Sequence, residues 1–447
     1  MSWKYNFRRN VCGVVCMAVG LVLTPTVDAS DGDVDADIEV ADRLALEHNQ
    51  SITAFESRIE ESRYRAESIE GRWPEPMVEY MADISAPWTP HTTTGHMIRL
   101  MQQIPLPGAR SRQAAPARSG EEAARVGQVE AQADLLRDIR RDAVELARIE
   151  AQLELIADEI GLIDDALSTA EAVAPFEGGD YGDFYQLELA RESAVDRRSQ
   201  LRSNRQARRT SMAARIGVER SDIDELEFAG ALLEEWLTEV PDRDELVGWA
   251  QRTEPELARL DAEAGIAAAE VERVDEQRRP WPSVMAGYSN MPPMFEMDGP
   301  RSQMFQLGVS IRLPISGGRY DAEASQWQAA SQAIEQDRSQ TRRELTGQID
   351  ELLDDWETDR GRLQRHLQEL APLASDLAEQ VLVGMEVGER TASDFLLALQ
   401  QEIELEATII DLRAEQLQRL MEFQRLTGGA FGDESPWAYP ETYGGQQ

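Results

Sequence analysis

The chain has 447 residues, a formal net charge of −38 at pH 7, four histidines and two cysteines. A chain this acidic repels nucleic acid, which excludes a role in binding DNA or RNA. Cys12 and Cys16 both lie in a segment that we expect to be removed, so the mature chain should have neither a disulfide nor a thiolate metal site.

Residues 1–29 have the pattern of a secretory signal peptide. Lys4, Arg8 and Arg9 precede an apolar run at 11–23, and the small residues that follow predict cleavage after Ala29. This run is too short to cross a bilayer of about 30 Å as a helix, and no later run reaches the roughly 18 apolar residues that a transmembrane helix needs. A secreted chain can still enter a membrane as a β-barrel.

The rest of the sequence repeats one unit with an offset of about 210 residues. WPEPMVEY at 73–80 returns as WPSVMAGY at 281–288, and Asp183-Phe184 returns as Asp394-Phe395. This period is too long for a solenoid and indicates duplication of a domain half. The predicted parts are a first repeat at 30–217, a connector at 218–242, a second repeat at 243–428 and a flexible C-terminal tail at 429–447.

Each predicted repeat has the same order of elements. A helical segment, at 36–72 and at 243–279, ends before Trp-Pro because proline cannot continue a helix. Two short strands follow, in hairpin regions at 73–105 and 281–314. A long helix at 110–174 or 319–384 comes next, and after a break that contains glycine a last helix extends to Gly217 or Gly428.

The long helices carry apolar residues at intervals of seven, which is typical of coiled coils. The row in the first repeat is Ile139, Leu146, Leu153, Ile160 and Leu167, and the row in the second is Ile349, Trp356, Leu363, Leu370 and Leu377. A helix of about 65 residues spans roughly 100 Å, more than one compact domain. An extended soluble coiled coil is one interpretation, but the strands argue against it.

Each strand has one aliphatic face and one polar face. Val78 and Tyr80 alternate with Glu79 in one strand, and Phe305 and Leu307 alternate with Gln306 in another. This pattern suits a membrane wall with lipid outside and water inside, although a half-buried soluble hairpin gives the same alternation. One chain supplies four strands, and the smallest single-chain membrane barrels have eight, so several chains should share one barrel.

In the order of these features, residues 40–428 resemble the TolC-like outer membrane efflux proteins. The resemblance rests on the Ala-Leu-x-x-Asn opening at Ala45–Asn49, the two hairpins and the turn VGERTASDFL at 387–396. It implies a mainly α fold with a small β part: two tandem repeats of long coiled-coil helices plus β-hairpins, which trimerise into an α-helical tunnel and a 12-stranded barrel. The implied location is the outer membrane of a Gram-negative bacterium, with the tunnel in the periplasm.

The resemblance further implies a homotrimer in outer membrane lipid that docks onto a periplasmic adaptor protein and an inner-membrane RND-type transporter. The residues that match the family's helix-tip turn are Val387, Gly388, Thr391, Asp394 and Leu396. The first-repeat tip at 176–185 lacks the Val-Gly and Thr of this pattern. Threefold repetition would place a ring of carboxylates at the tunnel mouth, from Glu177, Asp180, Asp183, Glu386 and Glu389; a solvated acidic surface is the alternative.

Nine of the 14 methionines fall in the two hairpin regions, and Met291, Met294 and Met297 cluster in one loop. Thioethers are soft ligands for Cu(I) or Ag(I), which resembles the heavy-metal (CusC/CzcC-like) branch of the family; flexible packing is the other interpretation. No catalytic motif and no cofactor motif is found, so an enzyme is not predicted. We expect a heavy-metal exit duct, with a drug or type I secretion duct, or a soluble periplasmic scaffold, as alternatives.

Overall fold

The structure is a computed structural model that describes residues 34–84, 94–173, 181–233, 240–291, 302–315, 317–387 and 389–428. The predicted signal peptide and the predicted C-terminal tail lie outside these residues. The described part is mainly helical and contains one small antiparallel sheet, which confirms the predicted fold class for a single chain.

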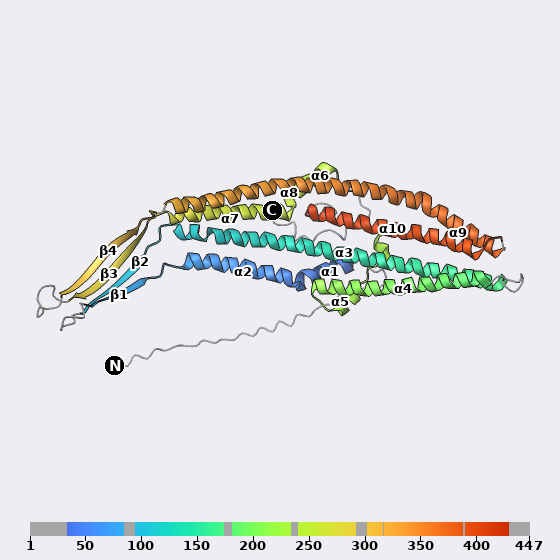
Figure 1. Cartoon of the computed structure of the whole chain (residues 1–447), viewed down its shortest axis with the longest axis horizontal. Coiled ribbons are helices and arrows are strands. Elements are labelled where there is room, and N and C mark those ends of the chain that lie inside the picture. The colour runs from blue at the N-terminus through green and yellow to red at the C-terminus, as the bar shows by residue number, and fades with distance from the viewer. Residues whose placement is uncertain are drawn as a thin grey trace, which may run out of the picture. The chain divides into compact units, whose positions relative to one another are not determined.

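The order of helix, two strands, long helix and last helix occurs twice along the chain (Figure 1). The first set is α1 (Val34–His48), α2 (Gln50–Gly71), β1 (Met77–Ile84), β2 (Thr94–Gln103), α3 (Ala109–Val173) and α4 (Tyr181–Ile216). The connector forms α5 (Arg220–Asp224) and a 3₁₀ turn, η1 (Gly230–Leu233). The second set is α6 (Arg243–Thr253), α7 (Pro255–Gln277), β3 (Trp281–Met291), β4 (Ser302–Arg312), α8 (Gly317–Arg365), η2 (His366–Leu370), α9 (Ala371–Glu386) and α10 (Ala392–Leu426).

The first helical segment of each repeat is divided in two, where the sequence predicts one continuous helix. Asn49 caps α2: its side chain accepts hydrogen bonds from the N–H groups of Ser51 (2.8 Å) and Ile52 (3.4 Å). The same side chain donates to the carbonyl of Arg215 (2.7 Å), at the end of α4. In the second repeat the break falls at Glu254, because Pro255 begins α7 and has no N–H to continue α6.

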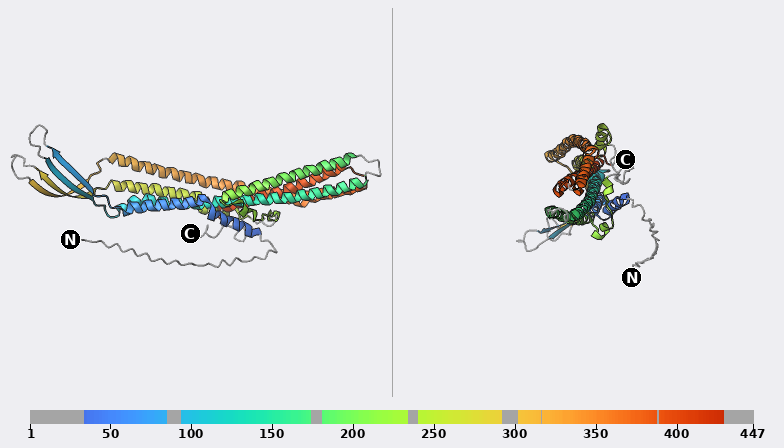
Figure 2. Two further views of the ribbon diagram at one scale, coloured as in Figure 1. Left: turned by 90° about the horizontal axis from the view of Figure 1, so that it is seen from below. Right: turned by 90° about the vertical axis from the view of Figure 1, so that its right-hand side faces the viewer.

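Helix α3 confirms the long helix predicted at 110–174, with 65 residues. It packs against α2 and α7 in the half nearer the sheet and against α4 and α10 in the other half (Figures 1 and 2). Ile139, Leu146, Leu153 and Ile160 are buried, and Leu167 is partly buried. Burial of each such side chain contributes about 1.5–3 kcal/mol, so the predicted apolar row holds these helices together.

The apolar row of the second repeat follows the prediction only as far as Leu363. Trp356 and Leu363 are buried, whereas Leu377 is 43 % exposed. The π-helical turn η2 lies between them and adds a residue to one turn, which rotates the following helix about its axis. Pro372 follows this turn directly. In a regular α-helix its ring would clash with the carbonyl group of the residue four positions earlier. The helical segment predicted at 319–384 is therefore present, but the π-helical turn shifts its apolar row after Leu363.

Both repeats end on a glycine with a positive φ angle, 94° at Gly217 and 61° at Gly428. This conformation stops α4 and α10 in the manner of a C-terminal glycine cap. A Cβ atom at Gly217 would lie 2.8 Å from the carbonyl oxygen of His48, and one at Gly428 would lie 2.8 Å from the Thr253 Cβ atom. Each glycine thus lets the end of the last helix approach the break in the first.

The four strands form one antiparallel sheet in the order β1-β2-β3-β4. The two hairpins are joined because β2 pairs with β3, with Arg99 opposite Gly287. The sheet continues from the ends of α2 and α7 (Figure 1). None of the described helices contains a stretch long and apolar enough to cross a membrane.

Candidate functional site

One face of the sheet carries aliphatic and aromatic side chains that stay exposed to solvent in the single chain. The register aligns Val78, Leu100, Ala286 and Leu307 in one row across all four strands. Tyr80, Ile98, Tyr288 and Phe305 form the next row. Leu307 is 89 % exposed and Phe305 is 81 % exposed. An exposed apolar surface of this kind marks a contact with lipid or with another protein.

The opposite face carries the charged side chains of the same strands. Its central row contains Glu79, Arg99, Gly287 and Gln306, and Arg99 forms an ion pair with Glu79 (3.6 Å). This alternation agrees with the strand faces that the sequence predicts. Met291 ends β3 on this polar face, opposite Ser302. Met294 and Met297 lie outside the described residues, so the predicted cluster of three is not placed.

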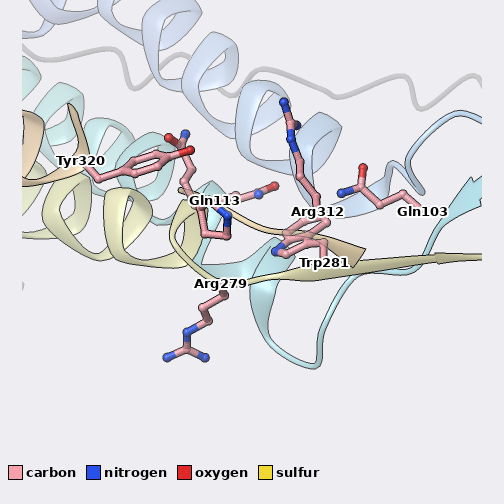
Figure 3. Close-up of a pocket in the computed structure, with 8 residues that line it drawn as sticks. Gln103, Gln113, Arg279, Trp281, Arg312 and Tyr320 are labelled. Carbon is pink, nitrogen blue, oxygen red and sulfur yellow. The ribbon is translucent and has the colours of Figure 1, made fainter. Parts of the chain in front are cut away.

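A polar pocket of about 330 Å³ lies where the sheet meets the helices (Figure 3). Trp281 and Arg312 face each other in the register of β3 and β4, and Tyr320 of α8 and Gln113 of α3 also line the pocket. In Figure 3 the Arg279 guanidinium points away from Tyr320. Trp281 and Arg312 both lie on the polar face of the sheet, the face of Arg99 and Gln306.

The second-repeat tip is a tight turn that starts α10 with a capping box. The N–H of Asp394 donates to the hydroxyl oxygen of Thr391 (3.2 Å), and the N–H of Thr391 donates to the Asp394 carboxylate (3.2 Å). The N–H and the hydroxyl group of Thr391 both donate to the Asp394 carboxylate (3.2 and 3.0 Å), and these two hydrogen bonds hold the pKa of Asp394 below its ordinary value. Val387 is 67 % exposed, and Leu396 is partly buried against an apolar cluster that includes Phe395. Gly388 lies outside the described residues.

Replacing Thr391 by alanine is expected to lower the free energy of unfolding by about 1 kcal/mol, because α10 loses its cap. The pKa of Asp394 should rise only part of the way toward its ordinary value, because alanine removes the hydroxyl hydrogen bond and keeps the larger contribution from the backbone N–H. A carboxyl group with a depressed pKa stabilises the fold above its unfolded pKa and loses this effect as the pH falls. Denaturation curves and NMR titration of Asp394 check both points; an unchanged pKa would show that the cap is not formed.

The two helix tips share one apolar cluster. Ile163 of α3 and Leu187 of α4 pack with Met385 of α9 and Phe395 of α10. Of the predicted tunnel-mouth carboxylates, Asp183 lies in the first turn of α4 and Glu389 is exposed in the turn before α10. Glu386 ends α9, while Glu177 and Asp180 lie outside the described residues. The shared cluster fixes Asp183 and Glu389 at the same end of the helices.

Charged groups buried among the helices were not predicted. Arg140 of α3 donates two hydrogen bonds to Asp42 of α1 (2.7 and 2.9 Å), and both side chains are almost fully buried. Asp142, which lies between Leu135 and Ile149 in a second row of α3 at intervals of seven, accepts hydrogen bonds from Arg208 (3.2 Å) and Arg215 (2.8 Å). The position of an acidic residue in an apolar row was a signal for such an ion pair in the sequence. The sequence did not indicate which distant arginines would be its partners.

A further buried carboxyl group, that of Glu254, lies at the break between α6 and α7. It lines a cavity of about 230 Å³ together with Glu130, Asp134 and Arg425, and its partner Arg425 lies at 3.3 Å. Burial raises the pKa of Glu254 to about 7, although Arg425 opposes this shift. Between its unfolded pKa and about 7, the folded chain therefore holds a proton that the unfolded chain releases.

The Glu254→Gln variant is expected to lose a pH dependence of stability. In the wild type, this group makes the free energy of unfolding decrease as the pH rises from about 5 to about 7, because the unfolded state then binds fewer protons. Glutamine does not titrate, so the variant should show a flatter profile of stability against pH. Denaturation at several pH values tests this; parallel profiles would contradict it.

The described residues contain no group of three or more His, Cys, Asp or Glu side chains that could hold a metal ion. His96 lies within β2. Its Nδ1 atom is 2.8 Å from the hydroxyl group of Tyr80, and the two rings stack. His91 lies outside the described residues.

Comparison with known proteins supports the same architecture. Residues 249–429 match the outer membrane efflux protein family, and no curated protein sequence matches. The outer membrane protein VceC from Vibrio cholerae has a TM-score of 0.70 at 15% identity, covering 89% of this chain and 97% of VceC. CusC, described as a transmembrane channel, has a TM-score of 0.74 at 14% identity over 89% and 93% of the two chains.

The MtrE outer membrane channel of Neisseria gonorrhoeae, solved in its open state, has a TM-score of 0.67 at 17% identity. It covers 89% of both chains. All three likenesses span nearly the whole length of the solved proteins, and the sheet and the helices are both included. The chain therefore has the fold of the outer membrane efflux channels, and residues 249–429 match the model of the outer membrane efflux protein family.

Proposed function

We propose that this protein is the exit duct of a tripartite efflux pump and lies in the outer membrane of a Gram-negative bacterium. The observation that carries the proposal is a four-stranded sheet with one exposed apolar face and one polar face, in the fold of outer membrane efflux channels. Three copies supply the 12 strands of one barrel, since four strands alone leave edges that lipid cannot satisfy. The helices continue this barrel as a tunnel in the periplasm.

The partners in this proposal are a periplasmic adaptor protein and an inner-membrane RND-type transporter. The adaptor docks at the helix tips, through Val387, Gly388, Thr391, Asp394 and Leu396. Support comes from the capped turn: Val387 is exposed to solvent at the end of α9, and Thr391 caps the start of α10. Asp183, Glu386 and Glu389, together with Glu177 and Asp180, form an acidic ring at the tunnel mouth that favours cations.

The proposed substrates are heavy-metal cations, with Cu(I) and Ag(I) first among them. The concentration of methionines in the hairpins supports this, because thioethers prefer soft metals. Met291, Met294 and Met297 would offer a transient path at the outer end of the duct. The duct has no catalytic role and no resident cofactor in this scheme.

Membrane fractionation tests the duct itself. The full-length protein is expected in the outer membrane fraction, as a trimer that dissociates when heated in detergent before electrophoresis. A protein released with the soluble periplasmic contents, as a monomer or dimer, would instead support the scaffold interpretation. The adaptor proposal is tested by crosslinking at Val387, with crosslinks at the exposed residue Leu189 of α4 as the control.

Growth of a deletion strain tests the substrate class. Loss of the protein should sensitise cells to copper and silver more than to dyes and detergents, and the wild-type gene should restore growth. Sensitivity confined to dyes and detergents would replace metal efflux by drug efflux and leave the duct in place. A variant with Met291, Met294 and Met297 changed to leucine should restore growth only partly if the loop contributes to the path.

A further inference from the structure

The strand methionines all lie on the polar face of the sheet. The strands contain seven methionines, and the register places every one of them on the face of Glu79, Arg99 and Gln306. The opposite, apolar face has none, although methionine is an apolar residue that would suit it. Packing against lipid therefore does not explain where these side chains lie.

Six of these methionines form two rows across the strands. Met77, Met101 and Met285 are direct neighbours on β1, β2 and β3. In the second row, Met81 faces Met97, and Met304 follows on β4 beyond Ser289. The row of Glu79 and Arg99 separates the two, so they lie roughly 14 Å apart along the strands at about 3.4 Å per residue.

Neighbours within a row are close enough to share one ligand. Directly opposed Cβ atoms in an antiparallel pair are about 4.5–5.5 Å apart, and a methionine side chain has three rotatable bonds. The row of Met77, Met101 and Met285 therefore can bring three thioethers to one ion above β2. Gly308 ends this row, and the Met285 side chain lies over it: a Cβ atom there would be 2.5 Å from the Met285 methyl carbon.

One thioether on this face has a polar partner. The Gln306 side-chain amide donates a hydrogen bond to the Met304 sulfur (3.4 Å). Met77, Met81 and Met304 are 62 %, 41 % and 50 % exposed, so their sulfur atoms are accessible from the polar side. Sulfur lone pairs that face water and amides are available to a metal ion.

We propose that the row of Met77, Met101 and Met285 is a binding site for a soft monovalent cation, Cu(I) or Ag(I), with three thioether ligands. Soft thioether ligands select such ions over Zn²⁺ or Mg²⁺. The row of Met81, Met97 and Met304 is the next site toward the outer strand ends, and Met291 follows. Thioethers carry no charge and therefore do not attract the ion as a carboxylate would. The ion can then leave one row and bind at the next. The inference rests on the proposed duct only in taking the polar face as the lumen.

Silver binding to the purified full-length protein in detergent tests the site without any transport assay. The probe is Ag(I) alone, followed through the ¹³C-labelled methionine methyl signals and by equilibrium dialysis. Silver is expected to shift the signals of Met77, Met101 and Met285, and to leave those of Met212 and Met421, which are buried among the helices. Zn²⁺ should shift none of them.

Three variants make the test specific. Met77→Leu/Met101→Leu/Met285→Leu should lose the silver-induced shifts at its row and bind less silver. Met294→Leu/Met297→Leu removes loop thioethers and should keep the row signals, as should Met212→Leu/Met385→Leu/Met421→Leu, which removes three buried methionines. The site is refuted if the wild type binds no silver, or if the row variant binds as much as the wild type.

Failure of this site and failure of the duct give different results. Conductance of the protein in a planar bilayer does not require silver binding. A protein that conducts but binds no silver at the row refutes the site and leaves the duct. A protein that binds silver at the row but neither inserts nor conducts refutes the duct and leaves the site.

Discussion

Replacing Leu307 by arginine is expected to abolish insertion into the outer membrane. Leu307 lies in the middle of β4 on the exposed apolar face, and its side chain is 89 % exposed in the single chain. An arginine at the middle of a bilayer costs about 2–4 kcal/mol per site on the lipid face of a barrel. The helices do not contact this side chain, so the soluble part should fold normally. Membrane fractionation and circular dichroism measure the two effects.

Gln306→Arg is the matched control for this variant. Gln306 is the neighbouring residue, at the same depth in the strand, but it faces the polar side with Arg99 and Glu79. A water-filled lumen accepts a further cation, so this variant should insert like the wild type. Equal behaviour of the two arginine variants would show that the apolar face does not contact lipid.

Replacing Arg140 by methionine is expected to lower the free energy of unfolding by about 3–5 kcal/mol. The substitution leaves the Asp42 carboxylate buried without its charged partner, and removal of one member of a buried ion pair has a cost of this size. The largest apolar cluster of the chain surrounds the pair, with Ile38, Ile139 and Ala143 close to it in sequence. Chemical denaturation in detergent measures the loss.

The pH dependence of this loss identifies its cause. Burial already raises the pKa of Asp42, and Arg140 opposes that shift, so the variant should raise it further. As the pH falls through this raised pKa, Asp42 takes up a proton and the buried charge disappears, and the deficit should shrink. Arg243→Met, which breaks an exposed ion pair with Asp350, should cost much less than Arg140→Met at any pH. A deficit independent of pH would point to lost packing.

The elements of the fold that depend on local pattern could be predicted from the sequence. The heptad row of Ile139 and Leu146 indicated a helix of the observed length, because burial at this spacing needs no knowledge of the partner. The alternation of Phe305 and Gln306 indicated the two faces of β4 in the same way. The glycine and proline signals marked the ends of the elements to within a few residues.

The remaining features depend on contacts that no local pattern contains. Asp42 and Arg140 are 98 residues apart, and nothing in either helix identifies the other as its partner. Pro372 was the one local sign of the shift in the apolar row at η2. The sequence did not show that a π-helical turn would form before this proline. The methionine rows could not be predicted without the pairing of β2 with β3. The alternation within a strand shows which side chains share a face, but it does not show which residues of the two hairpins lie opposite each other.

Conductance of the purified protein in a planar lipid bilayer is the most direct test of the proposed duct. The account predicts that heat-sensitive trimers insert and give stepwise currents carried preferentially by cations, because acidic side chains such as Asp183 and Glu389 lie at the tunnel mouth. Leu307→Arg should give no insertion events, and Gln306→Arg should conduct. A folded wild-type protein that never inserts and gives no current would contradict the claim that this chain forms an outer membrane channel.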